Sequence, residues 1–206
     1  MAQSTTVARS LIVALLLPAA ASAQGSGSLA TPRIFDALAL RSGATVCEIG
    51  AGDGELSLAA SDRVGGQGHV YTSELGEERV KALQAKVAAA SRAHIQVVAG
   101  ATDRTNFPDG ACDALFMRNV YHHIRAPGPM SASLSAALKP GGRLAVVDFT
   151  PPGAEASTPA ERASDGTHGV TPDSVRRELA DAGLLLERTE AGSGRWFMVV
   201  ATKPGT

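Results

Sequence analysis

The chain is short of cysteine, of aromatic residues and of any excess of one charge. Two of its 206 residues are cysteines and 4% are aromatic. Two cysteines are too few for a disulfide-stapled miniature fold or for a zinc site built from cysteines. Few aromatic rings disfavour a stacking surface for single-stranded nucleic acid. Because 19 basic residues face 20 acidic ones, a general binder of the phosphate backbone is also disfavoured. We therefore expect no nucleic-acid partner.

What is present is the composition of a globular protein. Hydrophobic residues make up 44% of the chain and charged residues 19%, so it can bury a core and is not disordered by composition. The length corresponds to about one domain at the usual size of roughly 150 residues.

The N-terminal segment has the features of a secretory signal peptide. Arg9 precedes a short apolar run, residues 11–17, which Pro18 ends, and Ala21-Ser22-Ala23 fits the small-residue rule for cleavage before Gln24. The run is too short to span a membrane. We expect residues 1–23 to be a signal peptide, 24–31 a flexible lead-in and 32–206 the domain, in an exported, periplasmic protein. The alternative is an uncleaved anchor or an ordinary helix, and the protein is cytoplasmic if the segment is not used for export.

The rest of the chain alternates between strand and helix patterns. Strands are expected at 45–49, 69–73, 94–99, 113–117 and 143–149, and helices at 33–40, 51–64, 77–90 and 130–138. A proline-containing loop over 150–169 precedes a helix at 171–182 and a hairpin of strands at 184–190 and 195–202. Alternating strands and helices indicate parallel crossovers. The expected fold is α/β: a doubly wound, mainly parallel seven-stranded sheet that ends in an antiparallel hairpin.

The segment after the first expected strand carries the most chemical information. Glu48 precedes Gly50-Ala51-Gly52-Asp53-Gly54, and a strand, a glycine turn and a helix together allow a ligand to approach free backbone N–H groups. The spacing differs from the dinucleotide fingerprint, because the place of its third glycine is taken by Glu55. A Walker loop is absent, since the sequence has no G-K-[ST].

This acidic G-x-G-x-G pattern resembles motif I of the class I S-adenosylmethionine (SAM)-dependent methyltransferases. The resemblance continues in three further segments in the family's order: 68–74, which ends in Glu74; 107–113, before the fourth strand; and 138–144, with the sequence LKPGGRL. It covers roughly residues 32–203. It implies a Rossmann-like methyltransferase fold and SAM as cofactor.

The resemblance also implies roles for individual residues. Glu48 would orient the amino group of SAM, the backbone at Gly52 would receive its amino-acid end, and Glu74 would accept both ribose hydroxyls. Asp103 would border the adenine in place of the acid that many members have at Ala101. The full expected cofactor set is Glu48, Gly50, Ala51, Gly52, Glu74, Leu75, Asp103 and Asn119. The alternatives are a strand-end carboxylate for Glu48, a solvated surface charge for Glu74 and a loop-capping role for Asp103.

Two adjacent histidines follow the fourth expected strand, where an open α/β sheet places its ligands. His122 and His123 are candidate catalytic bases, because a neutral imidazole can accept a proton near pH 7; alternatively, one caps a helix and the other packs. Only His168 could join them in a zinc site, and we expect no metal. Cys47 and Cys112 are expected to be small core residues at different heights on neighbouring strands, without a disulfide.

These observations favour a SAM-dependent methyltransferase with a small-molecule acceptor. Segment 118–120 is similar to the ubiquinone/menaquinone C-methyltransferases, but the rest of the substrate region does not assign a quinone. An exported SAM- or nucleotide-binding protein without turnover is the alternative. Glu55, at the place of the third glycine of the dinucleotide fingerprint, argues against a nicotinamide oxidoreductase. The acceptor atom and the oligomeric state stay open.

Overall fold

The structure is a computed structural model that describes Met1, residues 29–92 and residues 94–205. The expected signal peptide therefore lies outside the described residues, apart from Met1. Residues 24–28 of the expected lead-in also lie outside the described residues, whereas Leu29 is buried and a helix begins at Thr31. Within the part of the chain that is described, no helix is both long and apolar enough to cross a membrane.

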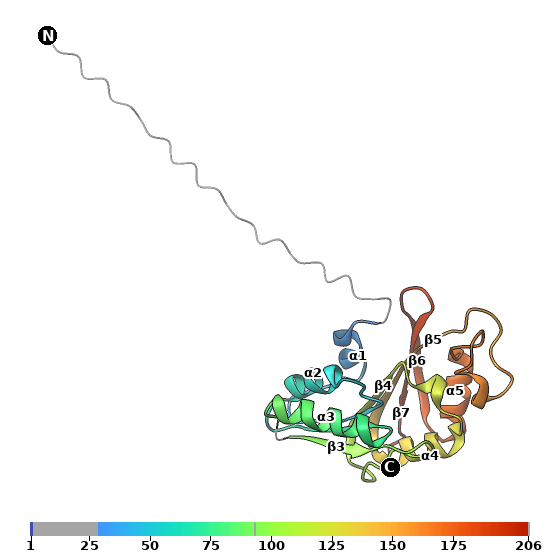
Figure 1. Cartoon of the computed structure of the whole chain (residues 1–206), viewed down its shortest axis with the longest axis horizontal. Coiled ribbons are helices and arrows are strands. Elements are labelled where there is room, and N and C mark those ends of the chain that lie inside the picture. The colour runs from blue at the N-terminus through green and yellow to red at the C-terminus, as the bar shows by residue number, and fades with distance from the viewer. Residues whose placement is uncertain (2–28, 93, 206) are drawn as a thin grey trace.

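A seven-stranded sheet forms the centre of the molecule (Figure 1). Its strands are β1 (Thr45–Ile49), β2 (His69–Glu74), β3 (Ile95–Ala99), β4 (Cys112–Arg118), β5 (Leu138–Phe149), β6 (Leu185–Ala191) and β7 (Trp196–Thr202). They are ordered β3-β2-β1-β4-β5-β7-β6. The first five run parallel, and β7 is antiparallel to both β5 and β6. The expected fold class and terminal hairpin are confirmed.

Helices cover both faces of this sheet. They are α1 (Thr31–Ala37), α2 (Glu55–Val64), α3 (Glu77–Ala89), α4 (Pro127–Ala137) and α5 (Pro172–Asp181), with short 3₁₀ turns η1 (Tyr121–His123) and η2 (Pro159–Glu161). Side chains of α1, α2 and α3 pack with one set of strand residues, including Val46 and Phe116. Those of α4 and α5 pack with the alternate set, including Leu115 and Met117. Because successive strand side chains point to opposite faces, the sheet separates two apolar cores.

The largest differences from the predicted element boundaries are at the starts of α2 and β5. The helix expected over 51–64 begins only at Glu55, because Gly50, Gly52 and Gly54 have positive φ and form a loop. β5 begins at Leu138, whereas the sequence pattern predicts a strand only from residue 143. Leu138 pairs with Cys112, and Gly141, which has φ +76°, donates to the carbonyl of Lys203 at 2.9 Å. These contacts join the segment to the sheet.

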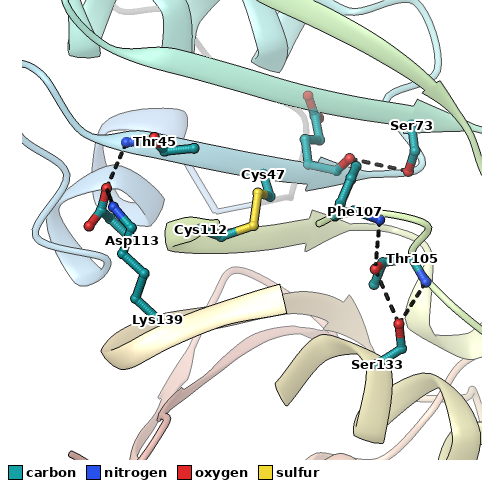
Figure 2. Close-up of a disulfide and its surroundings, with 10 residues drawn as sticks. Thr45, Cys47, Ser73, Thr105, Phe107, Cys112, Asp113, Ser133 and Lys139 are labelled. Carbon is teal, nitrogen blue, oxygen red and sulfur yellow. Dashed lines mark hydrogen bonds and ion pairs between the residues drawn. A yellow bond between two sulfur atoms is a disulfide. The ribbon is translucent and has the colours of Figure 1, made fainter. Parts of the chain in front are cut away.

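The prediction that the two cysteines do not pair is wrong: Cys47 and Cys112 form a disulfide between β1 and β4 (Figure 2). Strand register places Cys47 opposite Leu115, so regular alternation would put Cys112 on the other face of the sheet. The pairing of β4 with β5 is irregular between Cys112 and Ala114. This irregularity brings Cys112 into the same core as Cys47, which strand alternation alone cannot predict.

Candidate functional site

A cavity of about 830 Å³ opens at the carboxyl ends of the parallel strands. Its wall includes Ile49 at the end of β1, Glu74 at the end of β2, Gly100 after β3 and Arg118 at the end of β4. The strand order reverses between β1 and β4. Open α/β sheets bind ligands at such a switch point, and the volume lies within the usual range for small-molecule sites.

The glycine loop between β1 and α2 forms one wall of the cavity. Gly50 has φ +69°, and a Cβ at this position would lie 2.5 Å from a methyl carbon of Val120. Gly52 has φ +57°, a conformation that side chains with a Cβ rarely adopt. The predicted cofactor residues Gly50, Ala51 and Gly52 all line the cavity. The loop therefore exposes backbone to a ligand, and a larger residue at Gly50 would collide with the segment after β4.

Glu74 connects this loop to β2. One carboxylate oxygen accepts the backbone N–H of Gly52 at 2.7 Å, and the other accepts that of Leu75 at 2.8 Å. Arg79 lies 3.6 Å from the same carboxylate. The residue is only 7% exposed, so it is not the solvated surface charge of the alternative interpretation. Since each carboxylate oxygen has two acceptor positions, both oxygens can still accept one hydrogen bond from a ligand in the cavity.

Glu48 is a second carboxylate in the cavity wall, in a more buried place. Burial raises its pKa to about 7, while a hydrogen bond from the Ser57 hydroxyl and the charge of Arg118 act in the opposite direction. A cationic ligand beside Glu48 would favour its ionised form. The position thus suits a group that carries positive charge.

The remaining predicted cofactor residues divide into two groups. Leu75 and Asn119 line the cavity. Asp103 does not: its side chain is half-exposed and pairs with Arg104 at 3.3 Å, and the cavity wall is formed instead by Ala101, Thr102 and Arg104. The side chain expected to border the adenine therefore does not line the cavity, and the role of Asp103 stays a prediction. In the loop after β3, Arg104 lines the cavity, whereas the sequence spacing had suggested Asp103.

The histidine pair is divided between the cavity and the core. His123 lines the cavity, and burial together with its neighbours His122 and His168 lowers its pKa, so it is a neutral imidazole near pH 7. His122 is buried and is not part of the cavity wall. Its Nδ1 lies 2.8 Å from Asp148 and its Nε2 lies 3.0 Å from Nε2 of His168. Only His123 is placed to act as a base on a bound acceptor, so the catalytic role predicted for His122 is not supported.

Other cavity residues were missed by the sequence reasoning. Arg118 and Arg125 flank the histidine segment, Ala163 comes from the loop over 150–169, and Trp196 begins β7. Trp196 is the sole tryptophan of the chain, which was a signal that could have been used. Ala163 carries no such signal, because only the folding of the long loop brings it to the cavity.

Comparison with known proteins connects this geometry to a family. Residues 46–142 match the family model described as a methyltransferase domain. The ubiquinone/menaquinone biosynthesis C-methyltransferase of Pseudomonas entomophila is 33% identical over 118 residues, which cover 55% of this chain and 44% of that protein. Its counterpart in Marinomonas is 28% identical over 117 residues, with coverage of 56% and 47%. The chain thus spans about half the length of the curated relatives that it matches.

A solved structure extends the likeness to nearly the whole domain. The SAM-dependent methyltransferase from Aquifex aeolicus is 25% identical, with a TM-score of 0.72 and coverage of 84% of this chain and 89% of that one. The segment 46–142 that the family model matches contains the glycine loop, Glu48 and Glu74, which are among the residues of the cavity wall. In sequence over residues 46–142 and in fold over most of the chain, the protein is similar to the class I SAM-dependent methyltransferases.

Proposed function

We propose that this protein is a methyltransferase that transfers the methyl group of SAM to a small-molecule acceptor bound in the same cavity. The observation that carries the proposal is the position of Glu74 and the glycine loop together at the switch point of the sheet. The match to the family model and the SAM-dependent structural neighbour support the choice of cofactor.

The residues present fit SAM. Glu74 has acceptor capacity left for the two ribose hydroxyls. Glu48 suits the cationic amino group, and Arg118, whose charge lowers the pKa of Glu48, can balance the carboxylate of the same amino-acid end. The N-cap of α2 is a glycine, which has no side chain to satisfy the first N–H groups of the helix. Asp53 accepts the N–H of Glu55 at 3.2 Å, so it is the N–H groups after Glu55 that could receive the carboxylate of SAM.

The chemistry requires positioning more than acid–base assistance. When bound, SAM supplies an electrophilic methyl group on a sulfonium. The protein orients the acceptor and excludes water, which can account for a large part of the rate acceleration. Ala163 of the 150–169 segment lines the cavity, and we propose that this segment helps to cover the bound acceptor. His123 would take the proton from an acceptor that must lose one.

A dinucleotide cofactor fits less well. Glu55 stands where the fingerprint requires its third glycine and begins α2, with its N–H donating to Asp53 at 3.2 Å. Two acidic side chains at this helix start would repel a pyrophosphate.

The acceptor is proposed only as a small molecule. The relatives are named for ubiquinone and menaquinone biosynthesis, and the segment that the family model matches ends at residue 142. Ala163 and Trp196 line the cavity from beyond that segment. The part of the site that selects the acceptor therefore includes residues outside the matched region.

Isothermal titration of the full chain with SAM and with NAD tests the proposal. We expect one SAM per chain and no NAD binding. Formation of S-adenosylhomocysteine in the presence of a small-molecule extract then tests turnover, and mass spectrometry identifies the methylated product. Binding of NAD but not SAM would contradict the assignment. SAM binding without product from any extract would instead favour a binding protein that does not turn over its ligand.

We further propose that the protein is exported and that residues 1–23 are removed. Arg9, the apolar run and Ala21-Ser22-Ala23 support this, and so does the disulfide, which is typical of oxidising compartments. N-terminal sequencing of the protein from the periplasm of a bacterial host should give Gln24 as the first residue. A chain that retains Met1 would contradict the proposal.

A further inference from the structure

Three histidines from two distant segments meet beside the cavity. His122 and His123 belong to η1 after β4, and His168 ends the long segment after β5. One ring nitrogen of each lies within 4.8 Å of the others. We expected no metal because the sequence shows no third ligand close to the histidine pair. In the fold, His168 lies beside His122, although the two are 46 positions apart in the chain.

His122 has the orientation of a metal ligand. Its Nδ1 is 2.8 Å from Oδ1 of Asp148, which is fully buried and also accepts the backbone N–H of Phe149 at 2.9 Å. Because this carboxylate is an acceptor, Nδ1 of His122 carries the proton and Nε2 presents a lone pair. A carboxylate behind a histidine fixes the tautomer of metal-ligating histidines in the same way.

The lone pair of His122 points at His168. The two Nε2 atoms are 3.0 Å apart, so without an ion the proton on Nε2 of His168 forms the hydrogen bond. Moving that proton to Nδ1 of His168 gives a second imidazole nitrogen directed at the same point. This change of tautomer needs no further reactant, and no proton is gained or lost.

The segment that carries His168 is anchored. The guanidinium of Arg162 is buried and pairs with Glu178 at 2.6 Å and with Glu155 at 3.2 Å. Gly169 donates to the carbonyl of Arg162, and the ring of Phe149 packs 5.2 Å from that of His168. Little ordering is therefore required to bring the third ligand into place.

We propose that His122, His123 and His168 form a binding site for a divalent first-row transition-metal ion such as zinc. Imidazole nitrogen suits zinc, copper, nickel and iron, whereas calcium and magnesium require oxygen ligands. Three histidines leave a fourth position open, as in catalytic zinc sites. Since His123 also lines the cavity, an ion here would lie at the cavity wall.

The consequence for catalysis rests on the proposed function, although the metal site itself does not. At the cavity wall, an oxygen or sulfur atom of an acceptor could occupy the open position. Coordination lowers the pKa of a bound O–H or S–H group and would favour its deprotonated, nucleophilic form. Hydroxyl and thiol acceptors are the substrate class that such a site would select.

The test uses the full chain without a histidine tag, stripped of metal by a chelator. Zn²⁺ is titrated by calorimetry, and Co²⁺ by the visible absorption of a tetrahedral complex. We expect one ion per chain, with affinity at least tenfold weaker in His123→Ala and in His168→Ala. Both side chains are largely exposed, so the variants should fold. His69→Ala, which removes a histidine of β2, is the matched control and should bind as the wild type does.

Two results would overturn the proposal: no binding of either ion by the wild type, or binding that His168→Ala and His69→Ala affect equally. Because the titrations contain no SAM, they are independent of the proposed methyl transfer. SAM affinity of the same variants, measured separately, shows whether a failure concerns the metal site alone or the cofactor site as well.

Discussion

At the scale of single residues, two carboxylates in one cavity have different surroundings. Glu74 accepts two backbone N–H groups, those of Gly52 and Leu75. Glu48 lies deeper, where burial favours the neutral acid and raises its pKa to about 7. The first holds the glycine loop through the N–H of Gly52. The second can exchange a proton near neutral pH.

Glu48 should make the stability of the protein depend on pH. Its pKa rises from an ordinary value of 4.5 to about 7 on folding, so between these values the folded state binds more protons than the unfolded one. Stability from this residue is then fully present below about pH 4.5 and is lost as pH rises to about 7, by about 3 kcal/mol. Chemical denaturation from pH 5 to pH 8 should show wild type losing stability relative to Glu48→Gln. If the free energy of unfolding changes with pH in the same way in both proteins, the raised pKa of Glu48 is contradicted.

Glu74 should dominate the affinity for SAM. Charge-assisted hydrogen bonds contribute roughly 1.5–3 kcal/mol each, so Glu74→Ala should weaken SAM at least tenfold, about 1.4 kcal/mol. Glu74→Gln, which retains an acceptor oxygen, should fall between. Because Gly52 and Leu75 lose their acceptor in the alanine variant, its melting temperature should also fall. Titration calorimetry at low temperature separates the two effects.

Glu78 provides the control for this experiment. It is exposed near the start of α3, four residues from Glu74 in sequence. Glu78→Ala should leave SAM affinity unchanged. If the two alanine variants bind SAM equally well, Glu74 does not hold the ribose.

Strand ends were the most predictable residues of the site. The apolar pattern identifies the strands, and the topology then places their carboxyl ends at one edge of the sheet. The site residues located in this way are Glu48, Gly50, Gly52 and Glu74. His122 and Asp103 lie two or more residues further on, where the backbone has turned. Asn119 has φ +63°, and this turn directs His122 to the core and His123 to the cavity. No sequence pattern specifies that turn.

At the scale of elements, the disulfide fixes the two central strands to each other. Cys47 and Cys112 are separated by 65 positions, so the bond closes a long loop of the unfolded chain. It joins β1 and β4, the strands on either side of the switch point. The edge of the sheet that carries the cavity is therefore built on a covalently linked pair.

Removing this bond should destabilise the protein without abolishing its site. A disulfide that closes such a loop contributes about 2–4 kcal/mol, which corresponds to roughly 4–16 °C in melting temperature for a chain of this size. The double variant Cys47→Ala/Cys112→Ala should melt lower by that amount and still bind SAM. Calorimetry in the absence and presence of dithiothreitol measures the effect in the wild type. The variant should not respond to the reductant, and a wild type that also does not respond would show that the bond does not stabilise the fold.

Element identity was more predictable than element boundaries. Strand and helix order followed from alternating apolar patterns, and Thr171 caps α5 as its residue type predicts, accepting from the N–H of Ser174. The start of α2 was misplaced because positive φ at three glycines delays the helix to Glu55. β5 starts earlier than the apolar pattern indicates, because Leu138 pairs with Cys112 and Gly141 donates to the carbonyl of Lys203. Such long-range pairings are not visible in local sequence.

At the scale of the whole molecule, the order of the strands creates the site. Reversal between β1 and β4 leaves a crevice at their carboxyl ends, and every residue assigned to SAM lies at that edge. The two apolar cores on opposite faces hold the sheet rigid beneath it. The terminal hairpin and the 150–169 segment complete the cavity through Trp196 and Ala163. In the proposed function, cofactor and acceptor therefore meet where the strand ends and these two segments come together.

Hydrogen exchange of the full chain with and without SAM tests the central claim most directly, because it reports where the ligand binds. Backbone amides closed off by a ligand exchange more slowly. SAM should protect peptides that cover residues 50–57, 74–76 and 100–102, and NAD should protect none of them. Peptides from β6, at the far edge of the sheet, should be unchanged in both cases. Protection by SAM that is absent from the glycine loop and from Glu74, or that appears only elsewhere, would contradict the account.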